Sequence, residues 1–206
     1  MTKVKFCGIR RVQDLIKACE LNVDYVGFIL YPKSKRYVSF KELEELLPFA
    51  KGVKRVSVLV NPNYENVKKA LDRGIDLIQL HGEESFEFAK KVGLGRVIKA
   101  FRVKESLKIQ EEWRGVYAVL LDTHSGEAYG GTGKTFDWSI ARNVVEGGFR
   151  VFLSGGLNSE NVKEAIDYVR PYAVDVSSGI EISPGVKDHE KMERFLRVLT
   201  TSTMNS

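Results

Sequence analysis

The sequence predicts an α/β fold, a single (β/α)8 barrel, and three observations support this. Short runs of β-branched and aromatic residues alternate with longer stretches whose apolar residues repeat at helical spacing. Eight such runs occur, and their first residues lie about 20 to 32 positions apart, which leaves room for one crossover helix each time. Several runs are apolar almost throughout, as expected for parallel strands that are covered on both faces.

The expected strands cover residues 4–7, 25–29, 55–60, 77–80, 97–100, 118–121, 150–153 and 173–176. Between them, residues 14–21 carry an apolar stripe at helical spacing. Ser39 with Glu42 three positions later has the pattern of a capping box, and Asn158 precedes another amphipathic stretch. Residues 188–199 predict a last helix, so the alternation of strands and helices continues to the end of the predicted barrel.

One domain is the expectation for a chain of 206 residues. We assign residues 1–199 to the barrel and the small, polar residues 200–206 to a frayed tail. Residues 104–113 have no clear helical signal, so the fifth helix is poorly defined. The structural alternative is an open doubly wound sheet, but residues 7–10 (CGIR) lack the glycine fingerprint that commonly follows its first strand.

Composition excludes several classes of protein. Hydrophobic residues make up 43% and charged residues 29% of the chain, as in ordinary globular proteins. No apolar run approaches the ~20 residues of a membrane span, and residues 1–4 do not resemble the start of a secretory signal, so we expect a cytoplasmic protein without membrane contact. The two cysteines have no disulfide-scaffold spacing and are expected to be free thiols.

The net charge of +5 favours anionic partners. Lysines and arginines are interleaved with acidic residues and form no basic run, which favours a small phosphorylated or carboxylated molecule over nucleic acid. Binding of nucleic acid nevertheless remains the non-enzymatic alternative, and it predicts affinity that falls steeply with salt.

Reactive groups concentrate where the predicted strands end, which is where barrel enzymes build their active sites. Seven of the eight ends are polar or rich in glycine: Cys7, residues 31–37, Asn61, His81-Gly82, Asp122-Thr123, Ser154-Gly155-Gly156 and Ser177-Ser178-Gly179. A single Gly-Gly turn is often only a loop. Two such turns, Gly155-Gly156 and Ser178-Gly179, follow the last two strands, where many barrels bind phosphate.

Cys7 and Asp122 each have a structural and a catalytic interpretation. Cys7 fits a small packing residue, whereas a catalytic base would need its thiol pKa lowered from ~8.5 by nearby cations. Asp122 fits a cap for the following segment, whereas a general acid would need a raised pKa. Asp175, inside the last strand, is expected to point into the barrel as a polar support.

The three histidines have no metal-ligand spacing, and no metal is expected. We expect His81 to line the pocket, and His124 and His189 to lie on the surface. Residues 129–135 (YGGTGKT) lack the spacing of a nucleotide-binding phosphate loop and are interpreted as a mobile lid.

Seven segments together resemble the phosphoribosylanthranilate isomerase family of tryptophan biosynthesis. They are residues 5–9 (KFCGI), 31–39 (YPKSKRYVS), 79–82 (QLHG), 121–123 (LDT), 130–138 (GGTGKTFDW), 153–157 (LSGGL) and 174–181 (VDVSSGIE). They run in order through nearly the whole chain, which makes the resemblance specific. One departure is Arg10, where the family usually has threonine, and it concerns only the first loop.

The resemblance implies a TIM barrel that performs an Amadori rearrangement without a cofactor. The sequence leaves open whether the chain is a monomer or a homodimer. The resemblance also implies that Cys7 is the general base, Asp122 the general acid, and Arg36 the cation for the anthranilate carboxylate. His81 and Asp175 are expected in the substrate site, and the two turns (Gly155, Gly156, Ser178 and Gly179) are expected to hold the phosphate. The alternative within enzymes is another phosphate-binding barrel that acts on a sugar phosphate.

Overall fold

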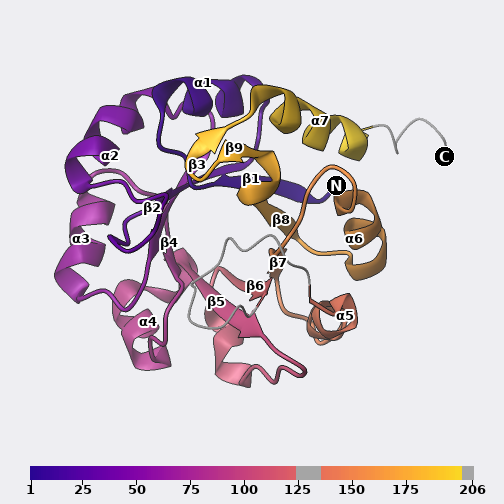
Figure 1. Cartoon of the computed structure of the whole chain (residues 1–206). Helices are drawn as coiled ribbons and strands as arrows, with labels where there is room; N and C mark the ends of the chain where they lie inside the picture. The colour runs from indigo at the N-terminus through magenta and orange to yellow at the C-terminus, as the bar shows by residue number, and fades with distance from the viewer. Residues whose placement is uncertain (124–135, 201–206) are drawn as a thin grey trace.

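The strands form one closed parallel barrel in sequence order (Figure 1). The computed structural model describes residues 1–123 and 136–200. The strands are β1 (Lys3–Cys7), β2 (Tyr25–Ile29), β3 (Lys54–Leu59), β4 (Leu77–Leu80), β5 (Val97–Val103), β6 (Ala118–Thr123), β7 (Val151–Leu153) and β8 (Ala173–Val176). β1 closes the barrel by pairing with both β2 and β8. The predicted barrel is confirmed, and every predicted strand lies within three residues of its observed limits.

Helices surround the barrel on the outside (Figure 1). They are α1 (Val12–Glu20), α2 (Phe40–Leu46), α3 (Tyr64–Asp72), α4 (Phe86–Val92), α5 (Trp138–Glu146), α6 (Val162–Val169) and α7 (His189–Thr200). The predicted capping box at α2 is present: Glu42 N donates to Ser39 Oγ at 3.2 Å, and Ser39 N donates to Glu42 Oε2 at 2.6 Å. No helix in the described part of the chain is long and apolar enough to cross a membrane.

The connection after β5 differs from the expected pattern of a helix after every strand. It contains only the short 3-10 turn η3 (Glu111–Gly115), because its residues lack an apolar stripe that could pack on the barrel. Trp113 covers this position instead. Its ring packs edge-on against those of Phe101 and Phe86, with centroids 5.7 and 5.2 Å apart.

A short antiparallel pair, β9 (Glu181–Ser183) and β10 (Val186–Lys187), was not predicted. It follows the 3-10 turn η4 (Ser178–Ile180) and precedes α7. Strands this short have no recognisable period of two. The pair is linked to α1, because Lys187 N donates to Asp14 Oδ2 at 3.1 Å. It also places two buried charged side chains, Glu181 and Lys187, at the mouth of the barrel.

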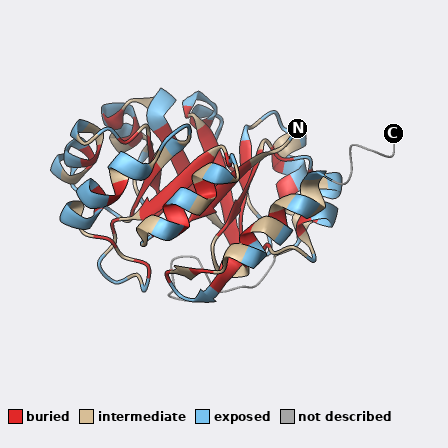
Figure 2. Cartoon of the chain, turned by 90° about the horizontal axis from the view of Figure 1, so that it is seen from above, coloured by how far each residue is buried: buried red, intermediate tan, exposed pale blue. Residues whose placement is uncertain are grey.

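The barrel interior changes from apolar to polar along its axis. One buried cluster contains nine interior side chains: Tyr25, Val56, Leu77, Ile98, Ala100, Ala118, Leu120, Phe152 and Ala173. Beyond them, towards the carboxyl ends of the strands, lie buried Lys5, Gln79 and Asp175, whose mutual hydrogen bonds connect β1, β4 and β8 across the interior. Figure 2 shows the strands as the buried centre of the molecule and the outer helix faces as exposed. The strand ends therefore open onto a buried polar layer.

Candidate active site

Cys7 is the last residue of β1 and its side chain is buried. Its neighbour in register on β2 is Gly27, and a Cβ there would lie only 2.7 Å from Cys7 Sγ, so glycine makes room for the thiol. Burial raises the pKa of the Cys7 thiol, and the charge of neighbouring Lys5 offsets only part of this effect. This differs from the lowered pKa that a catalytic thiol would need, because desolvation outweighs the charges of Lys5 and Lys187.

Asp122 lies near the end of β6, at the same end of the barrel as Cys7, and is also buried. Its Oδ1 accepts the backbone N–H of Thr123 at 2.8 Å, while its Oδ2 lies 3.4 Å from Nε2 of His81. The turn after β7 packs closely against it: a Cβ at Gly155 would lie 3.2 Å from Asp122 Oδ1 and 2.2 Å from Thr123 Oγ1. The carboxyl group therefore borders the first glycine turn.

A network of buried side chains links the surroundings of Cys7 to those of Asp122. Lys5 Nζ donates to Asp175 Oδ1 at 2.8 Å and to Gln79 Oε1 at 2.9 Å. Gln79 Nε2 lies 2.8 Å from Nδ1 of His81, whose other ring nitrogen faces Asp122. The sequence-predicted residues Cys7, Asp122, His81 and Asp175 thus belong to one polar layer.

Lys5 lies at the centre of this layer, in contact with both Gln79 and Asp175. Burial alone would lower the pKa of Lys5, but the Asp175 carboxylate and Cys7 raise it above its ordinary value, so the ammonium stays charged inside the barrel. Ser154 Oγ donates to the second oxygen of Asp175 at 3.2 Å. Both oxygens of Asp175 therefore have partners within the protein, as expected for a polar support.

Arg36 lies in the loop after β2, with its guanidinium buried against β9. Its Nε donates to Glu181 Oε1 at 2.9 Å and its Nη2 to Oε2 at 2.7 Å. Burial alone would raise the pKa of Glu181, but the hydrogen bonds from Arg36 and the charge of Lys187 lower it. Glu181 thus takes one edge of the guanidinium, and Nη1 has no hydrogen bond to a residue in the described ranges.

Lys187 of β10 joins Arg36 to Cys7. Its Nζ donates to Glu181 Oε1 at 2.9 Å and to the Cys7 carbonyl oxygen at 2.5 Å. The side chain is fully buried, and this burial lowers the pKa of Lys187 although Glu181 opposes the effect. The β9–β10 pair therefore holds both the guanidinium and the end of β1 in place.

The two predicted phosphate turns contact each other at the mouth of the barrel. Gly155 and Gly156 have φ values of +91° and +67°, which side chains rarely adopt, and Asn161 Nδ2 donates to the Gly156 carbonyl at 3.0 Å. Gly179 lies in η4, and a Cβ there would be only 2.0 Å from the Leu157 carbonyl oxygen. Ser178 and Gly179 of the second turn therefore lie against the first.

The family model described as N-(5'-phosphoribosyl)anthranilate (PRA) isomerase matches residues 4–198. The chain belongs to this family. The N-(5'-phosphoribosyl)anthranilate isomerase of Aquifex aeolicus (strain VF5) is 54% identical over 199 residues, covering 96% of this chain and 98% of the relative. That of Geotalea uraniireducens (strain Rf4) is 46% identical, with 96% and 98% covered.

Solved structures of PRA isomerases have the same fold. The Thermotoga maritima enzyme superimposes with a TM-score of 0.86 at 41% identity, covering 98% of this chain and all of the other. A PRA isomerase in complex with reduced 1-(o-carboxyphenylamino)-1-deoxyribulose 5-phosphate has a TM-score of 0.83 at 38% identity, with the same coverage. The family that the sequence motifs predicted is confirmed.

Several residues that build this PRA isomerase site had no assigned role in the sequence analysis. Lys5 precedes Cys7 by two positions, and strand alternation places both on the inner face, so a lysine there was a detectable signal. The contacts of Gln79, Glu181 and Lys187 depend on distant segments and had no local signal. His189 Nε2 donates to Asp14 Oδ1 at 2.9 Å, and the His189 side chain is 41% exposed, which agrees with its predicted surface position.

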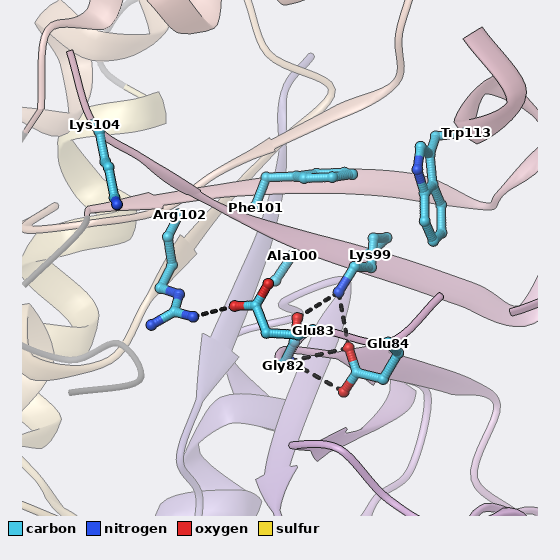
Figure 3. Close-up of a pocket in the computed structure, with 9 residues that line it drawn as sticks. All are labelled: Gly82, Glu83, Glu84, Lys99, Ala100, Phe101, Arg102, Lys104 and Trp113. Atoms are coloured by element: carbon cyan, nitrogen blue, oxygen red, sulfur yellow. Dashed lines mark hydrogen bonds and ion pairs between the residues drawn. The ribbon is translucent and has the colours of Figure 1, made fainter. Parts of the chain in front are cut away.

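A cavity of about 340 Å³ lies beside this site, between the turn after β4 and the strand β5 (Figure 3). Lys99 Nζ donates to the Gly82 carbonyl oxygen at 2.6 Å and to Glu84 Oε2 at 2.8 Å, and Arg102 pairs with Glu83. These contacts tie β5 to the turn that follows His81. The ammonium group of Lys99 therefore stabilises that turn.

The remaining sequence predictions concern residues outside the described ranges. His124 and the expected lid, residues 129–135, both lie there, as does the tail beyond residue 200. Within residues 1–123 and 136–200, no group of three histidine, cysteine, aspartate or glutamate side chains is arranged to hold a metal ion.

Replacing Gly179 by alanine is expected to destabilise the protein by about 1–3 kcal/mol and to weaken substrate binding. The new Cβ would meet the Leu157 carbonyl oxygen at 2.0 Å, so the two turns must move apart. Thermal unfolding and KM measure the two effects. Gly95→Ala is the matched control, because a Cβ at Gly95 meets nothing within 4 Å. An unchanged KM for Gly179→Ala would contradict the assigned role of the turn.

Proposed function

We propose that this chain converts N-(5′-phosphoribosyl)anthranilate to 1-(2-carboxyphenylamino)-1-deoxyribulose 5-phosphate, the Amadori rearrangement of tryptophan biosynthesis. The observation that carries the proposal is the buried polar network that runs from Lys5, the charged neighbour of the Cys7 thiol, through Gln79 and His81 to the carboxyl group of Asp122 at one barrel mouth. Membership of the PRA isomerase family supports the reaction, and a relative in complex with a reduced form of this product supports the choice of substrate.

In the proposed mechanism, Asp122 donates its proton to the furanose ring oxygen of the substrate. The C1′–O bond breaks, and the lone pair of the anthranilate nitrogen forms a protonated Schiff base at C1′. This iminium acidifies the C2′–H bond, and the Cys7 thiolate removes that proton. The resulting enolamine tautomerises to the ketone. The substrate nitrogen accepts the electron pair, so the chemistry requires no metal or redox cofactor.

The substrate would be held at its two anionic ends. Arg36 presents the guanidinium edge that Glu181 leaves open, and a planar carboxylate fits such an edge. The turns at Gly155-Gly156 and Ser178-Gly179 would hold the phosphate by backbone N–H groups. His81 and Asp175 would form the pocket wall between them. Anchoring both ends places the reacting carbons between base and acid.

Fluorescence provides the test of this function. Purified protein is expected to consume N-(5′-phosphoribosyl)anthranilate with loss of its anthranilate fluorescence, and the product is identified by mass spectrometry and NMR. Absence of turnover would reject the proposal. A control with an aldose phosphate that lacks the aromatic amine distinguishes this reaction from a general sugar-phosphate isomerisation.

We also propose that the chain acts in the cytoplasm as a monomer or homodimer, with residues 1–199 as its catalytic domain, and that it binds no nucleic acid. A related structure from Thermotoga maritima is of monomers generated from a dimeric PRA isomerase, which supports both states as candidates here. Light scattering with size-exclusion chromatography would measure the state, and titration with DNA at low salt would reveal any nucleic-acid binding.

Replacing Arg36 by lysine is expected to raise KM by about ten- to a hundredfold with a small change in kcat. A lysine still offers Glu181 a positive charge but has no fork for a second carboxylate, and hydrogen bonds to charged groups contribute about 1.5–3 kcal/mol. Steady-state kinetics on the anthranilate substrate measures the effect. Lysine is preferable to methionine, which would leave buried Glu181 with Lys187 as its sole cation in the described site. An unchanged KM would remove Arg36 from substrate binding.

A further inference from the structure

One buried polar atom at the site is unexplained by the mechanism above. His81 is 8% exposed, and its Nε2 has no hydrogen-bond partner among the described residues. The atom lies 3.4 Å from Asp122 Oδ2, close enough for an ion pair but outside hydrogen-bond geometry. Unpaired buried polar atoms are rare in folded proteins and call for an explanation.

The neighbouring side chains determine which ring nitrogen of His81 carries a hydrogen. Lys5 can only donate, so the atom of Gln79 that faces Lys5 Nζ at 2.9 Å must be the amide oxygen. The amide nitrogen of Gln79 then faces His81 Nδ1 at 2.8 Å, and it too can only donate. Nδ1 is therefore the acceptor, and in the neutral ring the hydrogen lies on Nε2.

We propose that Lys5, acting through Gln79, fixes His81 as the Nε2–H tautomer, and that this N–H stabilises the Asp122 carboxylate when Asp122 gives up its proton. Lys5, Gln79 and His81 are then positioning residues that act through Asp122. The inference rests on the proposed function, because it assumes that Asp122 is the general acid.

The two oxygens of Asp122 explain why the tautomer matters. Oδ1 already accepts the backbone N–H of Thr123 at 2.8 Å, whereas Oδ2 faces Nε2 of His81. When the acid loses its proton inside a buried site, negative charge develops on the carboxyl group, and an N–H donor aimed at Oδ2 binds the charged form more strongly than the neutral one. The opposite tautomer would direct a lone pair at the same oxygen. The fixed orientation of Gln79 excludes that arrangement.

Gln79→Glu most directly disturbs the hydrogen-bond relay formed by Lys5, Gln79 and His81. Its carboxylate can still accept a hydrogen bond from Lys5, but it offers His81 Nδ1 an acceptor in place of a donor. The hydrogen is then expected to move to Nδ1. Nitrogen-15 NMR of histidine-labelled protein at alkaline pH distinguishes the two tautomers, and His81→Gln identifies the resonances of this residue by their loss.

Once the His81 resonances are assigned, the wild-type spectrum decides the tautomer: the expected result is Nε2–H at His81, and Nδ1–H would overturn the proposal. In Gln79→Glu we expect Nδ1–H together with a kcat lowered about tenfold or more and a KM changed less than threefold. An unchanged tautomer, or a KM that changes instead of kcat, would overturn it. If Gln79→Glu fails to fold, Gln79→Met keeps the volume and is expected to show a mixture of both tautomers.

A double-mutant cycle separates the relay from simple damage to packing. If Gln79 acts through His81, then Gln79→Glu is expected to add little further loss of kcat in the His81→Gln background. Additive losses would overturn the relay. Failure of the proposed function is distinguishable, since wild-type protein with no isomerase activity but with the Nε2–H tautomer would reject the reaction and retain the tautomer assignment.

Discussion

Replacing Asp122 by asparagine is expected to lower kcat at least about 10²-fold, because the variant has no proton to give to the ring oxygen of the substrate. Asparagine has nearly the same shape, and its amide oxygen can still accept the Thr123 N–H at the position of Oδ1. KM is expected to change little, since Asp122 acts on the reacting atoms and holds neither anionic end. Steady-state kinetics on N-(5′-phosphoribosyl)anthranilate measures both constants.

The control for this variant is Asp137→Asn. Asp137 is an exposed carboxylate that caps α5 through Ser139 N at 2.9 Å. Its replacement is expected to leave kcat unchanged, with only a small effect on the unfolding midpoint. Near-normal turnover in Asp122→Asn, with a native circular dichroism spectrum, would exclude Asp122 as the general acid and would leave the barrel assignment untouched.

Strand positions were predictable from sequence because parallel barrel strands are covered on both faces. Such strands are nearly continuous apolar runs, and the polar residue that ends each run then marks the mouth of the barrel. Cys7 and Asp122 were selected as candidates in this way, without any knowledge of contacts. The limits of β5 were less accurate, since the strand continues through Phe101 and Arg102 to Val103, where polar and apolar residues alternate.

The contacts that organise the site were beyond the reach of sequence reasoning. Lys5 and Asp175 are 170 positions apart, and Lys187 meets the carbonyl oxygen of Cys7 across 180 positions. Only barrel closure through β1 and β8 brings these pairs together. The β9–β10 pair is too short to leave a periodic signal, yet it supplies Glu181, which orients Arg36. Local patterns therefore pointed to the candidate groups Cys7 and Asp122, while the tertiary fold supplied their partners.

The buried charges of the site share a common effect: they restrict the freedom of the groups that would meet the substrate. Glu181 occupies one edge of Arg36, so the guanidinium has a single edge left to offer. Asp175 is held at both oxygens by Lys5 and Ser154. Groups whose orientation is set before binding need little reorganisation during the reaction, and this is the main source of electrostatic catalysis.

Replacing Cys7 by serine is expected to lower kcat at least about 10²-fold, because a hydroxyl group is a far weaker base precursor than a thiol at neutral pH. The side chains differ by one atom, and Gly27 leaves room for either, so the fold should persist. Cys19→Ser is the matched control. Cys19 lies on α1, outside the barrel interior, and its replacement is expected to leave kcat unchanged.

Titration of the Cys7 thiol itself tests the same role. Only the thiolate reacts rapidly with iodoacetamide, and burial raises the pKa of this thiol above its ordinary value. In the Cys19→Ser background, the rate of inactivation by iodoacetamide is therefore expected to rise with pH and to level off only above that raised pKa. The charge of Lys5 opposes the effect of burial, so Lys5→Met should move the rising limb to still higher pH. An inactivation rate that levels off below the ~8.5 of a free thiol, or alkylation of Cys7 that leaves turnover intact, would contradict this assignment.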